Sequence, residues 1–201
     1  MSDSTPVVER TIRAWVSPLV TLLARAGINP NALTFVGLFL NFGAAYVVWI
    51  GQLRLGAVAF LFASGFDMLD GALARLRGKE SRLGAFLDST FDRLSETALF
   101  VAILHDILVR GYGPWWLPEI TLLALAGSLS TSYVRARAES LGQECKVGWL
   151  ERPERVVLLV VGLAVGPSAL GYVIFALAVL TWVTTIQRIA HVWRSLGGPP
   201  E

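Results

Sequence analysis

Long apolar segments alternate with short polar breaks along most of the chain. The segments cover residues 32–50, 53–76, 82–109, 115–137, 154–166 and 169–190. Most approach the roughly 20 residues that an α-helix needs to cross the hydrocarbon core of a bilayer, and the fifth is the shortest. The pattern predicts an all-α integral membrane protein with six transmembrane helices.

The segment before the first apolar stretch has a different pattern. Between residues 6 and 26, apolar side chains such as Val8, Ile12 and Trp15 lie on one helical face, with Arg10 and Arg13 elsewhere. This predicts an amphipathic juxtamembrane helix on the membrane surface, its arginines near anionic head groups; an ordinary packed helix is the alternative. The expected organisation is an interfacial segment 1–30, a six-helix transmembrane catalytic domain 31–195 and a short tail 196–201.

Composition agrees with a membrane protein, because 54% of the 201 residues are apolar and only 16% are charged. The charges are also polarised. Of the 17 lysines and arginines, only Arg54 and Arg110 fall on one side of the predicted membrane, and the other fifteen lie on or near the opposite side. The positive-inside rule therefore places both termini in the cytoplasm of a multi-pass cell-membrane protein, which requires an even number of spans.

Four aspartates border the break between the second and third segments. Asp67 and Asp70 share a helical face with Gly71, Ala74 and Arg75, since these positions are three, four, seven and eight residues after Asp67. Gly84, Asp88 and Asp92 are spaced by four and form a second column. The polar stretch between the columns is typical of a tight turn. Two antiparallel helices joined there would bring the carboxylates face to face.

Four converging carboxylates need a counter-charge if they are to stay ionised in a partly buried site. An all-oxygen ligand set without His or Cys favours Mg²⁺ or Mn²⁺, and four carboxylates can hold two ions. Gly71, Gly84 and Ala74 leave room for a ligand near the helix backbone, and Arg75 offers a fork for phosphate oxygens.

Three other interpretations of the aspartates are open. One is a polar helix pair held by ion pairs to Arg75, Arg82 and Arg93. Another is a divalent-cation channel or transporter, but Asp106 and Glu119 lie at the far surface and no acidic residue joins them to Asp67. The third is a non-catalytic membrane scaffold, which gives no account of the spacing. An enzyme with a metal-dependent site is favoured.

The spacing Asp67-x2-Asp70-Gly71-x2-Ala74-Arg75-x8-Gly84-x3-Asp88-x3-Asp92 resembles the signature of the CDP-alcohol phosphotransferase family. The resemblance implies six transmembrane helices, a homodimer, two metal ions and transfer of a phosphatidyl group from a CDP-linked lipid to an alcohol. It also implies that the first three aspartates and the metals position the pyrophosphate, and that Asp92 is both a metal ligand and the base.

The resemblance extends to residues before the first span, where Asn29-Pro30 and Thr34 fit a short family pattern. Asn31 and Thr34 would then help bind the cytidine or its phosphates, although both residues fit a helix cap equally well. Asn31 is also expected to cap the first span. The predicted donor-binding residues are Asn31, Thr34, Asp67, Gly71, Ala74, Arg75 and Gly84.

A second basic cluster predicts the acceptor site. Its members are Ser132, Arg135, Arg152, Arg155 and Arg188. Positive-inside bias explains some of these arginines, but as a group they indicate an anionic acceptor, since guanidinium forks suit phosphate. The stretches SYVRARAE and ERPER are similar to those of the phosphatidylinositol-phosphate synthase branch, whose acceptor is inositol phosphate. Glycerol 3-phosphate is the alternative acceptor, CDP-diacylglycerol the expected donor, and nucleic acid is not expected as a partner.

Overall fold

The computed structural model describes residues 20–78 and 81–197, and all regular secondary structure in these ranges is helical. The helices are α2 (Pro30–Trp49), α3 (Leu53–Leu76), α4 (Arg82–Arg110), α5 (Leu117–Ser140), α6 (Arg152–Val165) and α7 (Pro167–Leu196). Each predicted apolar segment corresponds to one of these helices. The largest difference is at the end of α7, which continues beyond the predicted end at residue 190.

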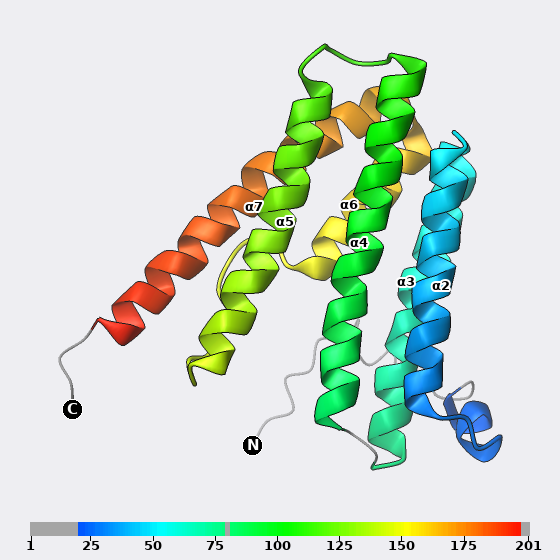
Figure 1. Cartoon of the computed structure of the whole chain (residues 1–201), viewed down its shortest axis with the longest axis vertical. Helices are drawn as coiled ribbons and strands as arrows, with labels where there is room; N and C mark the ends of the chain where they lie inside the picture. Colours follow the sequence, from blue (N-terminus) through cyan, green and yellow to red (C-terminus); the bar gives the residue numbers. More distant parts are fainter. Residues whose placement is uncertain (1–19, 79–80, 198–201) are drawn as a thin grey trace.

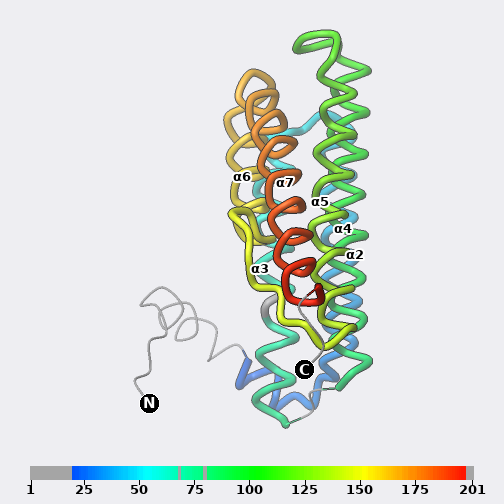
Figure 2. The backbone as a smooth tube through the Cα atoms, turned by 90° about the vertical axis from the view of Figure 1, so that its left-hand side faces the viewer, coloured from blue at the N-terminus to red at the C-terminus, as the bar shows by residue number. Residues whose placement is uncertain are grey.

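The helices run up and down in a bundle, with α2, α3 and α4 on one side and α5 and α7 on the other (Figure 1). Helix α2 packs against both α3 and α4, while α7 packs against α5 and α6. Viewed from the side, α6 and α7 form one layer beside the layer of α4 and α5 (Figure 2). The first turn of α4 and the last turns of α3, α5 and α7 lie toward the same, lower end of the bundle (Figure 1).

Local sequence signals explain where the helices begin and end. The N-cap of α2 is Asn29, whose side chain accepts a hydrogen bond from the backbone of Asn31 at 3.1 Å, so the prediction of Asn31 as the cap was wrong. Pro30 follows at the first helical position, where its missing N–H costs nothing. Ser81 caps α4 through the Gly84 amide at 3.0 Å. At its other end α4 stops at Gly111, whose φ of 64° glycine adopts without strain.

Residues 20–25 are helical, but most of the predicted amphipathic helix, residues 6–26, lies outside the described residues. Val20 packs with Leu33 and Leu69 in a small apolar cluster. Arg77, just after α3, donates hydrogen bonds to the carbonyl oxygens of Ile28, at 2.7 Å, and of Ala24. The approach to α2 is thereby fixed against the end of α3, beside the aspartate motif.

The outer surface of the bundle is apolar. Large side chains such as Phe39, Phe62 and Tyr172 are more than half exposed, as expected where a helix faces lipid rather than water. Three helices, α2, α3 and α7, are long and apolar enough to cross a membrane. Of the others, α4 carries several charges and α6 has only 14 residues. The apolar helices indicate a membrane protein.

Candidate active site

The four aspartates lie on α3 and α4, near the lower end of the bundle. Asp67 and Asp70 come from α3, and Asp88 and Asp92 from α4. Asp88 repels each of the other three electrostatically, so the four charges share one region. Among the residues that the structure describes, however, no group of three or more Asp, Glu, His or Cys side chains has a metal-binding arrangement. The role of these four residues as metal ligands stays a prediction.

A residue of α2 holds Asp67 through a hydrogen bond, and this contact was not part of the sequence motif. Asn41 is 1% exposed and its side-chain amide donates to Asp67 Oδ2 at 3.1 Å and to the Gly37 carbonyl at 3.0 Å. Gly37 permits the close approach, because a Cβ there would lie 2.2 Å from Asp67 Oδ1. A buried asparagine in an apolar span was the available signal, since such a polar group needs a partner.

A first cavity, of about 160 Å³, opens between α2, α3 and α4. It is lined mainly by small residues and one arginine. Its walls contain every predicted donor-binding residue except Asp67, namely Asn31, Thr34, Gly71, Ala74, Arg75 and Gly84, together with Asp70 and Asp88. A Cβ at Gly71 would lie 3.6 Å from Arg75 Nη1, and one at Gly84 would lie 3.1 Å from Ser81 Oγ, so glycine keeps both helix backbones open to the cavity. The Arg75 guanidinium lines the same cavity, where it could bind phosphate oxygens.

A second cavity, of about 420 Å³, lies between α4, α5, α6 and α7. All five residues of the predicted acceptor site line it, namely Ser132, Arg135, Arg152, Arg155 and Arg188. Asp88 and Asp92 line it too, and Asp88 and Ala85 also belong to the first cavity. The two cavities therefore meet at Asp88.

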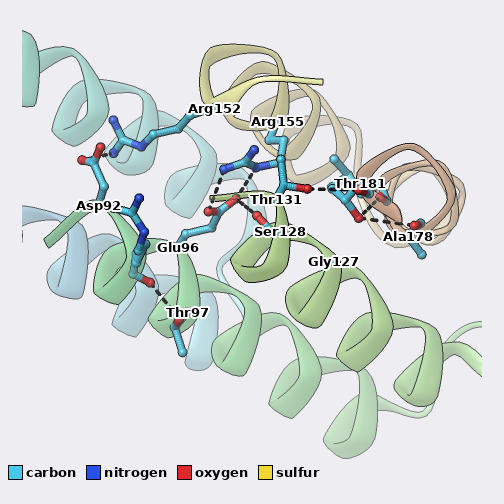
Figure 3. Close-up of polar contacts among 12 residues, drawn as sticks. Asp92, Glu96, Thr97, Gly127, Ser128, Thr131, Arg152, Arg155, Ala178 and Thr181 are labelled. Atoms are coloured by element: carbon cyan, nitrogen blue, oxygen red, sulfur yellow. Dashed lines mark hydrogen bonds and ion pairs between the residues drawn. The ribbon is translucent and has the colours of Figure 1, made fainter. Parts of the chain in front are cut away.

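The arginines of the second cavity already have partners within the chain. Arg152 Nη2 lies 2.7 Å from Asp92 Oδ1 (Figure 3). The same nitrogen lies 3.4 Å from Asp67 Oδ2, so one guanidinium bridges α3 and α4. Arg135 pairs with Glu139 at 2.9 Å on the exposed side of α5. The arginine that pairs with Asp67 and Asp92 is thus Arg152 of α6, and not one of the three arginines of the ion-pair interpretation.

Arg155 and Arg188 are more deeply buried, each 2% exposed. Arg155 pairs with Glu96 (Figure 3). Glu96 continues the four-residue spacing of Asp88 and Asp92, but the sequence analysis did not identify it as a site residue. Arg188 donates to the carbonyl oxygens of Thr131 at 2.9 Å and Val147 at 2.8 Å. These bonds connect α7 to α5 and to the loop before α6, and so shape the cavity wall.

The oxygen atoms of the four aspartates are suitable ligands for divalent cations. Asp67 and Asp92 both pair with the Arg152 guanidinium, so their carboxylates face a common region that holds a cation. All four side chains offer carboxylate oxygens, and none of the cavity residues is His or Cys. This set suits Mg²⁺ or Mn²⁺ better than zinc.

Comparison with known proteins agrees with this geometry. Residues 27–189 match the family described as CDP-alcohol phosphatidyltransferase. The archaetidylinositol phosphate synthase of Methanothermobacter thermautotrophicus is 40% identical over 193 aligned positions, covering 92% of each chain. The phosphatidylinositol phosphate synthase of Mycobacterium tuberculosis is 35% identical over 210 aligned positions, covering 96% of this chain and 92% of the relative.

Solved structures of the Mycobacterium tuberculosis phosphatidylinositol phosphate synthase, PgsA1, have the same fold. The crystal structure with CDP-DAG bound superposes with a TM-score of 0.82 at 37% identity, covering 89% of this chain and 93% of that one. The complex with manganese and citrate gives a TM-score of 0.83 at 36% identity, covering 89% and 88%. The resemblance inferred from the aspartate motif is confirmed: the chain belongs to the CDP-alcohol phosphatidyltransferase family.

Proposed function

We propose that this protein is a phosphatidylinositol-phosphate synthase, which transfers a phosphatidyl group from CDP-diacylglycerol to a hydroxyl of inositol phosphate and releases CMP. The observation that supports this most is the pair of cavities meeting at Asp88. One cavity is lined by small residues and Arg75, the other by five arginines. The relatives named phosphatidylinositol and archaetidylinositol phosphate synthase, and the structures with CDP-DAG and with manganese, support the same reaction.

The first cavity would hold the donor diphosphate. Gly71 and Gly84 let it approach the helix backbones, Arg75 binds its oxygens, and Asn31 and Thr34 lie beside it for the cytidine end. Asp67, Asp70, Asp88 and Asp92 would hold two divalent ions, Mg²⁺ or Mn²⁺, which neutralise the diphosphate and polarise the β-phosphorus. Asn41 keeps Asp67 in place from α2.

The second cavity would hold the acceptor, with its phosphate among Ser132, Arg135, Arg152, Arg155 and Arg188. Asp92 accepts the proton of the attacking hydroxyl. The oxygen then bonds to the β-phosphorus of the donor, the bond from that phosphorus to the CMP oxygen breaks, and CMP leaves. Most of the rate enhancement would come from positioning and charge stabilisation.

The alternatives are less well supported. A channel needs an acidic path, yet Asp106 on the far half of α4 is 2% exposed and is held by Arg110 at 2.7 Å and Tyr112 at 3.0 Å. Glycerol 3-phosphate would satisfy the same arginines, so it remains the competing acceptor.

The test is CMP release by the purified protein with CDP-diacylglycerol and Mn²⁺ or Mg²⁺, in the presence of different alcohols. Inositol phosphate should be turned over, and free inositol should be a very poor acceptor because the arginines would have no anion to bind. Turnover of glycerol 3-phosphate without turnover of inositol phosphate would refute the proposed acceptor and retain the transferase. Absence of CMP release with every acceptor would refute the transferase itself.

We further propose that α2–α7 all span the cell membrane, that residues 1–30 contribute an interfacial helix, that both ends of the chain face the cytoplasm, and that the protein is a homodimer. The charge asymmetry and the family support this arrangement. Cysteines placed at positions 52 and 112 should be labelled from outside the cell, whereas the loop at Lys146 should be protected. Labelling of positions 112 and 146 from the same side would contradict the topology, and a monomer by light scattering would contradict the dimer.

A further inference from the structure

Glu96 lies one helical turn beyond Asp92 on α4 and lines the second cavity. It is 6% exposed, and an ionised carboxylate at such a position requires strong partners. The metal-binding prediction does not include it, and a bare carboxylate would repel an anionic acceptor. Its role must therefore come from the groups that it binds.

Three hydrogen bonds engage both oxygens of Glu96. Arg155 donates from Nε to Oε1 at 2.8 Å and from Nη2 to Oε2 at 3.2 Å, and Ser128 Oγ donates to Oε1 at 2.7 Å (Figure 3). The two-point contact fixes the plane of the guanidinium as well as its position. Because a guanidinium has five N–H donors, the Nη1 edge and the second Nη2 hydrogen are left for other partners.

Stability alone is a weak explanation for this pair. Removing two charges from water is costly, and a buried ion pair often gives no more stability than apolar residues of the same volume. Both members of this pair line the cavity that also holds Asp88 and Asp92. Ser128 adds a further bond to the carboxylate from α5, so α4, α5 and α6 together set the direction of one arginine.

We propose that Glu96 is a positioning residue that holds Arg155 in the orientation in which its free edge meets the acceptor phosphate. This inference rests on the proposed function, since it assumes that the second cavity takes a phosphate-bearing acceptor. Glu96 acts on the acceptor only through Arg155. Neither Glu96 nor Arg155 lines the first cavity, which is proposed to hold the donor.

A double-mutant cycle tests the inference with three variants, Glu96→Gln, Arg155→Gln and the two combined. Glu96→Gln keeps the shape of the side chain but removes its charge and one of the two oxygens that accept hydrogen bonds. It should raise the KM for inositol phosphate roughly ten- to a hundredfold, the usual penalty for a misplaced binding group, and leave the KM for CDP-diacylglycerol within about twofold. With Arg155→Gln already present, Glu96→Gln should change the acceptor KM no further.

Asp106→Asn is the matched control. Asp106 is a second buried carboxylate on α4, paired with Arg110 but remote from both cavities. Its replacement should lower the melting temperature about as much as Glu96→Gln does, and should leave the acceptor KM unchanged. Glu96→Asp, which keeps the charge, should recover part of the lost acceptor affinity and carries the test if Glu96→Gln does not fold.

The outcomes distinguish a failure of the positioning role of Glu96 from a failure of the proposed acceptor. If the Glu96 and Arg155 effects on the acceptor KM multiply, or if Glu96→Gln lowers only the melting temperature, the positioning role is wrong. If the wild-type protein uses another phosphate-bearing alcohol, the proposed acceptor is wrong, and the same cycle measured with that alcohol still decides the role of Glu96.

Discussion

The two cavities that meet at Asp88 differ in how their walls are made. The first is small, about 160 Å³, and is walled by helix backbone at Gly71 and Gly84 with Arg75 at its edge. The second is larger, about 420 Å³, and its walls alternate arginines with acidic residues. The first cavity would therefore fit its ligand mainly by shape, and the second mainly through its charged side chains.

This difference matches the two proposed substrates. A diphosphate that is fixed by metal ions and backbone needs space more than further charge, whereas a soluble anion must be drawn in and oriented by guanidinium groups. Acidic neighbours such as Glu96 and Glu139 hold the arginines of the second cavity, and its five arginines are matched by five acidic side chains. Changes in one cavity should therefore affect one substrate, and changes at their junction should affect both.

Asp88→Asn at the junction should have the largest effect. The substitution preserves shape but removes a negative charge where the metals and both substrates converge. The turnover rate should fall about a thousandfold or more, corresponding to about 4 kcal/mol of lost transition-state stabilisation. CMP release at saturating levels of both substrates measures the loss, and excess Mn²⁺ should restore little of it. Near-normal turnover would rule out a role for Asp88 in metal binding.

Arg135→Gln should affect the acceptor alone. Arg135 is 37% exposed and its partner Glu139 is on the same helix, so its replacement should not disturb the fold. Loss of one charge-assisted contact costs about 1.5–3 kcal/mol, and the KM for inositol phosphate should rise about ten- to 150-fold. The KM for CDP-diacylglycerol should stay the same.

The control for this variant is Arg137→Gln, two residues further along α5 and outside the second cavity. It should leave both KM values unchanged. If Arg135→Gln raises the donor KM instead, Arg135 belongs to the donor site or to the membrane surface.

Gly37→Ala should act on the aspartate site from α2. Its new methyl group would lie 2.2 Å from Asp67 Oδ1, so Asp67 must move or α2 and α3 must separate. Displacing a group that orients a ligand typically costs ten- to a hundredfold in metal affinity, and Mn²⁺ binding followed by electron paramagnetic resonance should weaken by about that factor. Gly43→Ala on the same helix is the control, since open space surrounds that position. Equal Mn²⁺ binding by both variants would exclude Asp67 from the metal site.

The sequence predicted the helices well because long apolar segments and their breaks are local features. Helix α3 begins and ends at the predicted residues, and the fixed spacing of the aspartates correctly placed them on two helices. The N-cap was placed two residues late because Asn29 and Asn31 both flank Pro30, and only the backbone geometry distinguishes them.

The sequence pattern could not predict the contacts between helices. Asn41 and Glu96 reach their partners Asp67 and Arg155 across 26 and 59 positions of the chain, and no local spacing records such a pair. The pairing of Arg152 with Asp92 and Asp67 was missed for the same reason. Each of these residues was visible only as a polar group in or beside an apolar helix.

The smallest effect is expected for Gly71→Ala, which tests the first cavity by shape alone. The nearest side-chain atom to a Cβ at this position would be Arg75 Nη1 at 3.6 Å, an ordinary contact, and alanine is the better helix former. The fold should therefore tolerate the change, while the added methyl group narrows the space over the α3 backbone. One methyl group in a fitted pocket is worth about 1–3 kcal/mol, so the KM for CDP-diacylglycerol should rise about tenfold, near the lower end of that range.

The acceptor KM should not change in Gly71→Ala, in contrast to the result expected for Arg135→Gln. Gly65→Ala, six residues earlier on α3 with open space around it, is the matched control and should leave both values unaltered. A rise in the acceptor KM alone would mean that the small cavity holds the acceptor, and the assignment of the two cavities would have to be exchanged.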